Sequence, residues 1–307
     1  MQESIQRFLL ETQNPDGSWG YTPGKVGALE PTAYACLSLI GIPNAHSNLQ
    51  KGIENIRATQ SPEGGWAGSS SDNQPAPWAT ALAGFVLLNS EGLITASGFA
   101  ADFIVNAVEK TPRHWMLRIA EWMQSWDPSY VDKNLRGWNW NSGTATWIEP
   151  TTYALIFLKR FVRMGGWAHE NRAHNLNKIT READELIYAR TCKGGGWNYG
   201  NSRVLGEELR PYPLTTALAL IALQDSPNRV ENRDSLEYLK KSIDDEKSAL
   251  ALSFATISLQ IYGVETSRII QEIADLYKET QFFSNVRTTA LALLALQSKD
   301  GKNYFKL

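Results

Sequence analysis

The sequence repeats one phrase, a glutamine followed six residues later by a tryptophan, and the copies at Gln13 and Gln60 lie 47 residues apart. A shorter copy has Cys192 in the glutamine position, and a fragment ends at Gln281. The copies are Leu10–Trp19, Ile56–Trp66, Ala189–Trp197 and Lys278–Gln281. Repeats of roughly 20 to 50 residues are typical of proteins built from similar supersecondary units that stack on one another. We therefore predict a repeat architecture.

A short segment rich in alanine, leucine and threonine also recurs along the chain, in most cases after a polar turn. Four of the six segments begin with proline close to threonine, a combination that favours the start of a helix. The segments are apolar on nearly every side, so we expect helices that are buried all round. They are Pro31–Leu37, Pro77–Leu82, Pro150–Leu155, Pro213–Leu218, Lys247–Leu252 and Arg287–Leu291.

The segments that carry the glutamine phrase, and their counterparts, mix charged residues with apolar residues at helical spacing. Such helices are amphipathic and should lie outside the buried ones. They are Ser4–Thr12, Leu49–Thr59, Arg181–Arg190, Ser235–Lys241 and Ser267–Thr280, and we expect another within Ala100–Gln124. Six buried helices paired with six amphipathic helices predict an all-α fold, an (α/α)6 barrel or α-α toroid, as one domain over residues 1–307. All six inner helices would begin at the same end of the barrel, where we expect a pocket.

Charge and cysteine usage exclude several classes of protein. The net charge is -2 and the lysines and arginines are scattered, so no nucleic-acid-binding surface is indicated. Two cysteines cannot form a disulfide framework, which favours a reducing compartment. The first residues lack the pattern of a signal peptide, and no apolar run approaches the roughly 18 residues of a membrane span. We expect a cytoplasmic protein, with peripheral membrane contact left open.

The repeated phrase resembles a motif of a known superfamily. Gln13, Gly17 and Trp19 fit Gln-x3-Gly-x-Trp, and Pro-Thr-Ala follows at the start of the next predicted helix. This combination resembles the QW repeat of terpenoid cyclases of the squalene-hopene type and the related toroid of protein prenyltransferase β subunits. The resemblance implies the α-α toroid fold, an isoprenoid-like apolar ligand, and acid-initiated carbocation chemistry.

Two glutamates stand where class II cyclases of this superfamily carry their acidic motif. Class II cyclases carry Asp-x-Asp-Asp-Thr-Ala at the start of an inner helix, and this chain has Glu-Pro-Thr there, at Glu149 and again at Glu30. The resemblance makes both glutamates catalytic candidates. A dry aromatic surrounding would raise the pKa of Glu149 and make it a general acid. A glutamate at a helix start is also favoured by the helix dipole alone.

Metal chemistry finds little support in the sequence. The Asp-Cys pair and distant His that bind zinc in prenyltransferases are missing, because no carboxylate stands one or two residues before Cys36 or Cys192. His169 and His174 are five residues apart and miss the four-residue spacing of helical metal pairs. The magnesium-binding Asp-Asp-x-x-Asp motif and the Gly-Cys-Gly-Glu-Gln run of thioester domains are absent as well. We predict no metal and no cofactor.

Aromatic residues near the predicted barrel mouth are candidates for substrate binding, because ring faces stabilise carbocations and an isoprenoid needs an apolar pocket. Trp19, Trp66 and Trp197 are set aside, since they recur in the repeats and should pack between helices. Two arginines near the mouth are candidates for holding an anion. The binding candidates are Trp78, Trp138, Trp140, Trp147, Tyr34, Tyr153, Tyr212, Arg210 and Arg287.

Three function classes follow. The leading interpretation is an enzyme that cyclises an isoprenoid, with Glu149 as proton donor. The first alternative is a non-catalytic toroid that binds a lipid-like ligand or a protein partner. The second is a carbohydrate-active (α/α)6 enzyme that uses Glu30 and Glu149 as a carboxylate pair, provided that the carboxyl groups lie within roughly 10 Å.

Overall fold

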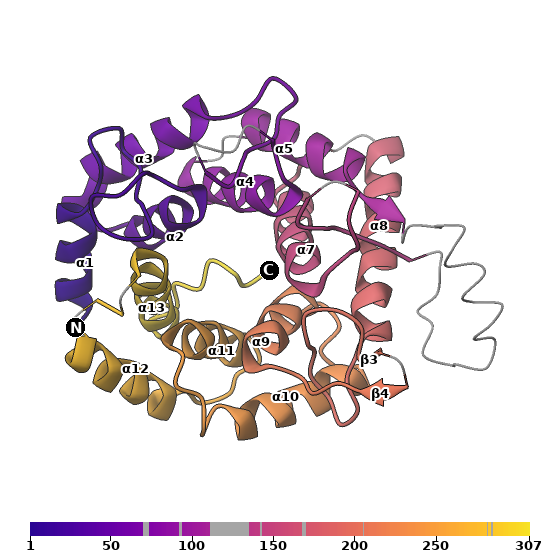
Figure 1. Ribbon diagram of the computed structural model, residues 1–307. Coiled ribbons are helices and arrows are strands. Elements are labelled where there is room, and N and C mark those ends of the chain that lie inside the picture. The colour runs from indigo at the N-terminus through magenta and orange to yellow at the C-terminus, as the bar shows by residue number, and fades with distance from the viewer. Residues whose placement is uncertain are drawn as a thin grey trace.

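The computed structural model describes residues 1–69, 74–91, 94–110, 135–141, 143–167, 170–204, 206–280, 282–283 and 285–307. In this part of the chain, twelve α-helices form two concentric rings (Figure 1). The prediction of an all-α (α/α)6 toroid is therefore confirmed. Among the described helices, none combines the length and the apolar character that a membrane span requires.

The inner ring consists of the six apolar helices predicted from the sequence. Each packs against the next, and the last packs against the first, so the ring is closed. The inner helices are α2 (Leu29–Leu39), α4 (Pro77–Glu91), α7 (Ile148–Arg163), α9 (Pro213–Ala222), α11 (Ala249–Ile261) and α13 (Val286–Lys299).

The outer ring contains the amphipathic helices. One of them, α5, begins at Ile94, earlier than the predicted range Ala100–Gln124, of which residues 111–124 lie outside the described part. Asp102 is its only charged residue, so charge periodicity did not mark its start. The outer helices are α1 (Gln2–Glu11), α3 (His46–Ala58), α5 (Ile94–Asn106), α8 (Glu170–Ala189), α10 (Val230–Ser242) and α12 (Ser267–Thr280), with a 3-10 turn η1 (Pro43–Ala45) before α3.

Two short antiparallel hairpins lie in the connections between helices. Strand β1 (Glu109–Lys110) pairs with β2 (Arg136–Gly137), and β3 (Arg203–Val204) pairs with β4 (Glu207–Glu208). Both lie outside the inner ring (Figure 1). They leave the helical architecture unchanged.

A buried tryptophan connects the outer and inner helix in each of the first four repeats. Its indole N–H donates to a carbonyl oxygen of the outer helix at 2.6–2.9 Å. Its backbone N–H donates to the hydroxyl of a threonine, the fourth residue of the inner helix, at 2.9–3.1 Å. The pairs are Trp19 and Thr32, Trp66 and Thr80, Trp138 and Thr151, and Trp197 and Thr216. The prediction that Trp19, Trp66 and Trp197 pack between helices is confirmed.

The glycine of the repeated phrase allows neighbouring repeats to approach closely. Gly17 and Gly64 have φ values of +85° and +88°, in the left-handed region that favours glycine. A Cβ atom at Gly64 would lie 2.7 Å from the carbonyl oxygen of Phe99 in the next outer helix. The glutamine of the phrase holds the same turn, since Gln60 donates to the Gly64 carbonyl at 3.1 Å.

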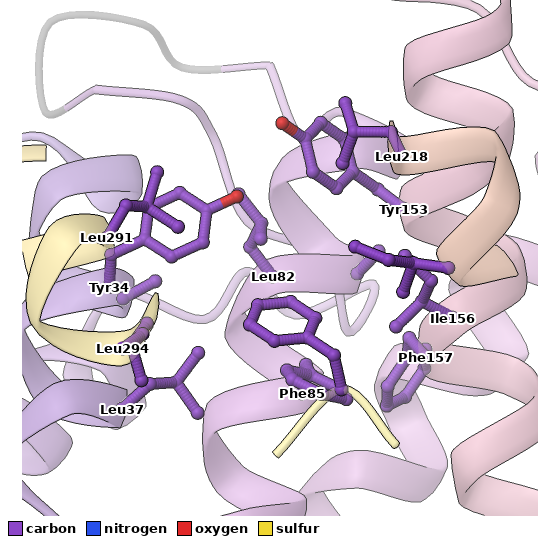
Figure 2. Close-up of a cluster of buried hydrophobic side chains, with 14 of the residues drawn as sticks. Tyr34, Leu37, Leu82, Phe85, Tyr153, Ile156, Phe157, Leu218, Leu291 and Leu294 are labelled. Atoms are coloured by element: carbon purple, nitrogen blue, oxygen red, sulfur yellow. The ribbon is translucent and has the colours of Figure 1, made fainter. Parts of the chain in front are cut away.

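The middle of the barrel is filled by side chains in layers (Figure 2). The second, sixth and ninth residues of an inner helix share one face. The sixth residues are at most 8% exposed, and the ninth residues drawn in Figure 2 are at most 3% exposed. The sixth residues are Tyr34, Leu82, Tyr153, Leu218, Phe254 and Leu291, and the ninth are Leu37, Phe85, Ile156 and Leu294.

Residues 302–307 cross the end of the barrel where the inner helices finish, and the C-terminus lies in the middle of the ring (Figure 1). Phe305 is 3% exposed and stacks on Phe85, with ring centroids 5.3 Å apart. Its carbonyl accepts from Gln224 at 2.8 Å, and the Tyr304 hydroxyl donates to the Ile40 carbonyl at 3.2 Å. This segment therefore covers the end of the barrel where the inner helices finish. It does not cover the opposite end, where they begin.

We predict that Thr216→Val lowers the free energy of unfolding by about 1–3 kcal/mol, because the buried backbone N–H of Trp197 loses its acceptor. Thr256→Val is a matched control: Thr256 is equally buried, but its hydroxyl bonds only to Leu252 of the same helix. The control should lose less than about 1 kcal/mol. Chemical denaturation measures both values, and equal losses would contradict the role of the tryptophan–threonine bond.

Candidate functional site

The mouth of the barrel is lined by the same position of every repeat. The second residue of each inner helix borders a cavity of about 290 Å³. In ring order these residues are Glu30, Trp78, Glu149, Leu214, Leu250 and Arg287. Tyr21, Trp140, Tyr153 and Phe254 complete its lining. The pocket expected at the starts of the inner helices therefore exists, and its chemistry is set by six equivalent positions.

One carboxylate of the cavity is fully paired. Glu30 is 7% exposed and accepts two contacts from the Arg287 guanidinium, at 3.0 and 3.2 Å. The hydroxyl of Tyr21 donates to the same carboxylate at 2.6 Å. Burial, followed by the neighbouring Glu30 charge, raises the pKa of Tyr21. The Tyr21 hydroxyl is thus a stable donor to Glu30 over a wide pH range.

The second carboxyl group, that of Glu149, is in a different state. It makes no hydrogen bond or ion pair with any residue that the structure describes. Burial, and secondarily the Glu30 charge, raises its pKa from 4.5 to about 7, while the Arg287 charge acts in the opposite direction. Near neutral pH a large fraction of Glu149 is therefore protonated and able to donate a proton.

The helix dipole does not reverse this conclusion. Glu149 lies in the first turn of α7, where the dipole favours the carboxylate by typically 0.3–1 kcal/mol. A pKa increase from 4.5 to about 7 corresponds to about 3 kcal/mol in favour of the protonated form. The larger effect decides the protonation state.

Aromatic rings form the walls and the floor of the cavity. Trp78 and Trp140 meet edge to face, with ring centroids 5.6 Å apart. Tyr153 lies one helical turn below Glu149, and Tyr34 occupies the equivalent place below Glu30. Their hydroxyl groups face the middle of the barrel (Figure 2). Burial raises the pKa of both tyrosines, so both remain neutral.

The sequence-based candidates are distributed over four places. Glu30, Glu149, Trp78, Trp140, Tyr153 and Arg287 line the cavity, and Tyr34 lies in the buried layer beneath it. Trp138 was expected at the mouth, but it is fully buried as the repeat tryptophan of the third unit and lines no part of the cavity. Its spacing of thirteen residues to Thr151 equals that of Trp19 to Thr32, a signal that could have revealed it.

Trp147, Tyr212 and Arg210 line a second, larger depression of about 890 Å³ beside the mouth. Sequence reasoning missed Tyr21, Leu214, Leu250 and Phe254 at the first cavity and Arg190 at the second. Leu214 and Leu250 could have been found, since each occupies the position that Glu30 and Glu149 occupy in their repeats. His169 lies outside the described residues, and no described group of His, Cys, Asp and Glu could hold a metal ion.

Solved structures of the same fold match nearly the whole chain. An alpha-1,6-mannanase of Salegentibacter has a TM-score of 0.63 at 8% identity and covers 98% of both chains. A type II terpene cyclase from Scytonema has a TM-score of 0.60 at 12% identity, over 98% of this chain and 96% of the cyclase. An alpha-amylase from Clostridium perfringens has a TM-score of 0.59 at 12% identity, over 97% of each chain.

No protein-family model matches the sequence, and no curated protein does either. The chain thus has the α/α toroid fold that terpene cyclases and glycosidases share. At these identities the likeness shows the fold alone, so the function has to be argued from the cavity.

The raised pKa of Glu149 predicts a pH-dependent stability. Because the folded state binds this proton more tightly than the unfolded state, the free energy of unfolding falls as pH rises from about 4.5 to about 7. Glu149→Gln removes this dependence. Relative to the variant, the wild type should lose roughly 2–3 kcal/mol between pH 5 and pH 8, measured by chemical denaturation. The exposed Glu3→Gln serves as control, and a wild-type curve parallel to that of Glu149→Gln would contradict the raised pKa.

Proposed function

We propose that the protein is an enzyme that begins its reaction by protonating the substrate, with Glu149 as the proton donor. The observation that supports this proposal best is the half-buried Glu149 carboxyl, which has no partner among the described residues and whose pKa of about 7 lies close to neutral pH. A general acid is most effective when its pKa is near the working pH. Glu30, which lines the same cavity, differs, because Arg287 and Tyr21 hold it in an ion pair and a hydrogen bond.

The leading substrate class is an isoprenoid-like chain that is cyclised through a carbocation. Trp78, Trp140 and Tyr153 place aromatic rings around the point of protonation, where ring faces would stabilise positive charge. The resemblance of the repeats to terpenoid cyclases and the structural likeness to a type II terpene cyclase support the same class.

The dimensions of the cavity restrict this substrate. A volume of about 290 Å³ is at the lower end of ligand pockets, roughly 300–1,000 Å³. The barrel below it is filled by the layers of Figure 2 and by Phe305. The cavity therefore accommodates a short chain or one end of a longer chain. A filled barrel is also what a non-catalytic binding toroid would have, so absence of turnover in a folded protein would favour that function.

The carboxylate pair supports a second candidate, the hydrolysis of a glycosidic bond. Glycosidases use one protonated carboxyl as acid and one carboxylate as base or nucleophile. Where the surroundings give two carboxyl groups different pKa values, the group with the higher pKa is assigned as the acid. Glu149 would be the acid and Glu30 the carboxylate. The likeness to a mannanase and an amylase supports this candidate as strongly as the cyclase likeness supports the first.

Product analysis by mass spectrometry tests both candidates. The purified protein is incubated with prenyl diphosphates of increasing length, squalene and its epoxide, and with manno- and malto-oligosaccharides. We expect turnover of one class, reduced at least a hundredfold in Glu149→Gln, because general acid catalysis contributes about 10²–10⁴. Glu3→Gln, also the second residue of a helix but exposed, should keep full activity. Full activity of Glu149→Gln would exclude Glu149 as the acid.

The pH dependence of turnover gives an independent prediction. A general acid must be protonated, so the rate should fall about tenfold per pH unit above about pH 7. Initial rates between pH 6 and pH 9 on the substrate identified above measure this limb. A rate that is constant or rises over this range would contradict proton donation by Glu149.

A further inference from the structure

The larger depression beside the mouth has features of a binding site in its own right. It is about 890 Å³ in volume and lies between the segments that lead into α7 and α9. We refer to it as the side groove, defined by Trp147, Arg190, Tyr199, Leu209, Arg210 and Tyr212.

Large apolar side chains are exposed in the side groove. Trp147, Tyr199, Val204 and Leu209 are 38–46% exposed, and these four line one depression although they come from two separate connections, one before α7 and one before α9. Tyr199 packs on Tyr212 with ring centroids 5.1 Å apart. Exposed apolar side chains that gather in a concave surface are typical of a ligand-binding site.

A buried cation, which has no carboxylate partner in the described part of the chain, forms part of the same wall. Arg190 is 5% exposed, and its guanidinium donates to the carbonyl and to the hydroxyl of Thr146, both at 2.9 Å. Its Nε–H has no acceptor among the described residues. Burial lowers the pKa of Arg190 to about 10, so the side chain is still charged at neutral pH. A buried charge that is not neutralised within the protein is costly, and an anionic ligand would neutralise it.

The remaining charged groups of the groove do not supply that neutralisation. Glu208 is the one carboxylate in the described lining, and it forms an ion pair with Lys193 at 3.7 Å. Arg210 adds a second positive charge at the rim, 5.4 Å from the centre of the Tyr212 ring. The groove therefore combines apolar walls with an excess of positive charge.

We propose that the side groove binds an oxyanion, a carboxylate or a phosphate, carried by a molecule with an apolar body. Arg190 and Arg210 bind the oxyanion, because a guanidinium offers paired donors that match carboxylate and phosphate oxygens. Trp147 and Tyr199 pack against the apolar body.

The groove adjoins the catalytic cavity along α7 and α9. Trp147 precedes Glu149 by two residues, Tyr212 precedes Leu214 by two, and the backbone N–H of Ile148 donates to the Tyr199 carbonyl at 2.9 Å. A ligand anchored by its oxyanion in the groove would extend its apolar end toward Glu149. The proposal thus adds a polar end to the substrate proposed above, but its test measures binding alone, so the two proposals fail separately.

Titration calorimetry with decyl phosphate, decanoate and decanol tests the proposal by measuring the affinity for each compound. Each compound is kept below the concentration at which it forms micelles. We expect the better of the two anions to bind at least tenfold more tightly than decanol, and the order of the anions shows whether phosphate or carboxylate is preferred. Arg190→Gln should abolish this tenfold advantage, whereas Arg190→Lys, which keeps the charge, should retain part of it. Glu149→Gln should bind decyl phosphate like the wild type, even if it turns over nothing.

Two exposed positions keep the test decisive if the buried Arg190→Gln fails to fold. Trp147→Ala should weaken decanol and both anions alike by at least threefold, because it removes part of the apolar wall. Arg210→Gln should weaken the anions by at least threefold and leave decanol unchanged. Equal affinity of the wild type for decanol and decyl phosphate, or unchanged anion affinity in both arginine variants, would overturn the proposal.

Discussion

The hydrogen bonds of the repeat tryptophan are the interaction on which the structure depends. In four repeats one tryptophan joins the two helices. Its indole N–H donates to the outer helix, and its backbone N–H donates to a threonine in the first turn of the inner helix. The carbonyl of the same residue accepts from the residue that precedes the inner helix, at 2.9–3.0 Å. The start of each inner helix is thereby fixed relative to its repeat. The fifth and sixth repeats lack the tryptophan, and Ser248 and Asn285 cap their inner helices instead.

Fixed helix starts make the mouth a set of six equivalent positions. Bonds between repeats extend this order: the first residues of α2, α7 and α13 donate to the loop of the following repeat, at 2.9–3.1 Å. The bond from Val286 to the Tyr21 carbonyl joins the last repeat to the first. Because the backbone frame is common to all repeats, the second residue of an inner helix can change its chemistry without changing its place. The architecture separates stability, carried by the tryptophans and layers, from the chemistry of the mouth, which one residue per repeat sets.

Sequence patterns predicted the toroid because its determinants are local. Two patterns can be recognised within windows of about twenty residues: the apolar segments that begin with proline and threonine, and the glutamine phrase. The site was predicted in part for the same reason: Glu30, Glu149 and Arg287 stand next to recognisable helix starts. Trp138 was misplaced because α5 lacks the charges that mark an outer helix, so the third repeat was not recognised. The burial of Arg190 depends on contact with Thr146, 44 residues away in the chain, which no local pattern reports.

The ring also explains why two glutamates with the same Glu-Pro-Thr surroundings differ in state. Arg287 is the only cation among the second residues of the inner helices. Helix α13 packs directly against α2, whereas two helices separate it from α7 in either direction around the ring. Arg287 therefore reaches Glu30 at 3.0 Å and leaves Glu149 unpaired across the mouth. Because Arg287 is paired with Glu30, its charge offsets only part of the effect of burial on Glu149. Burial therefore keeps the pKa of the unpaired Glu149 carboxyl group near 7. The different states of the two carboxyl groups thus follow from which helices are neighbours in a closed ring of six.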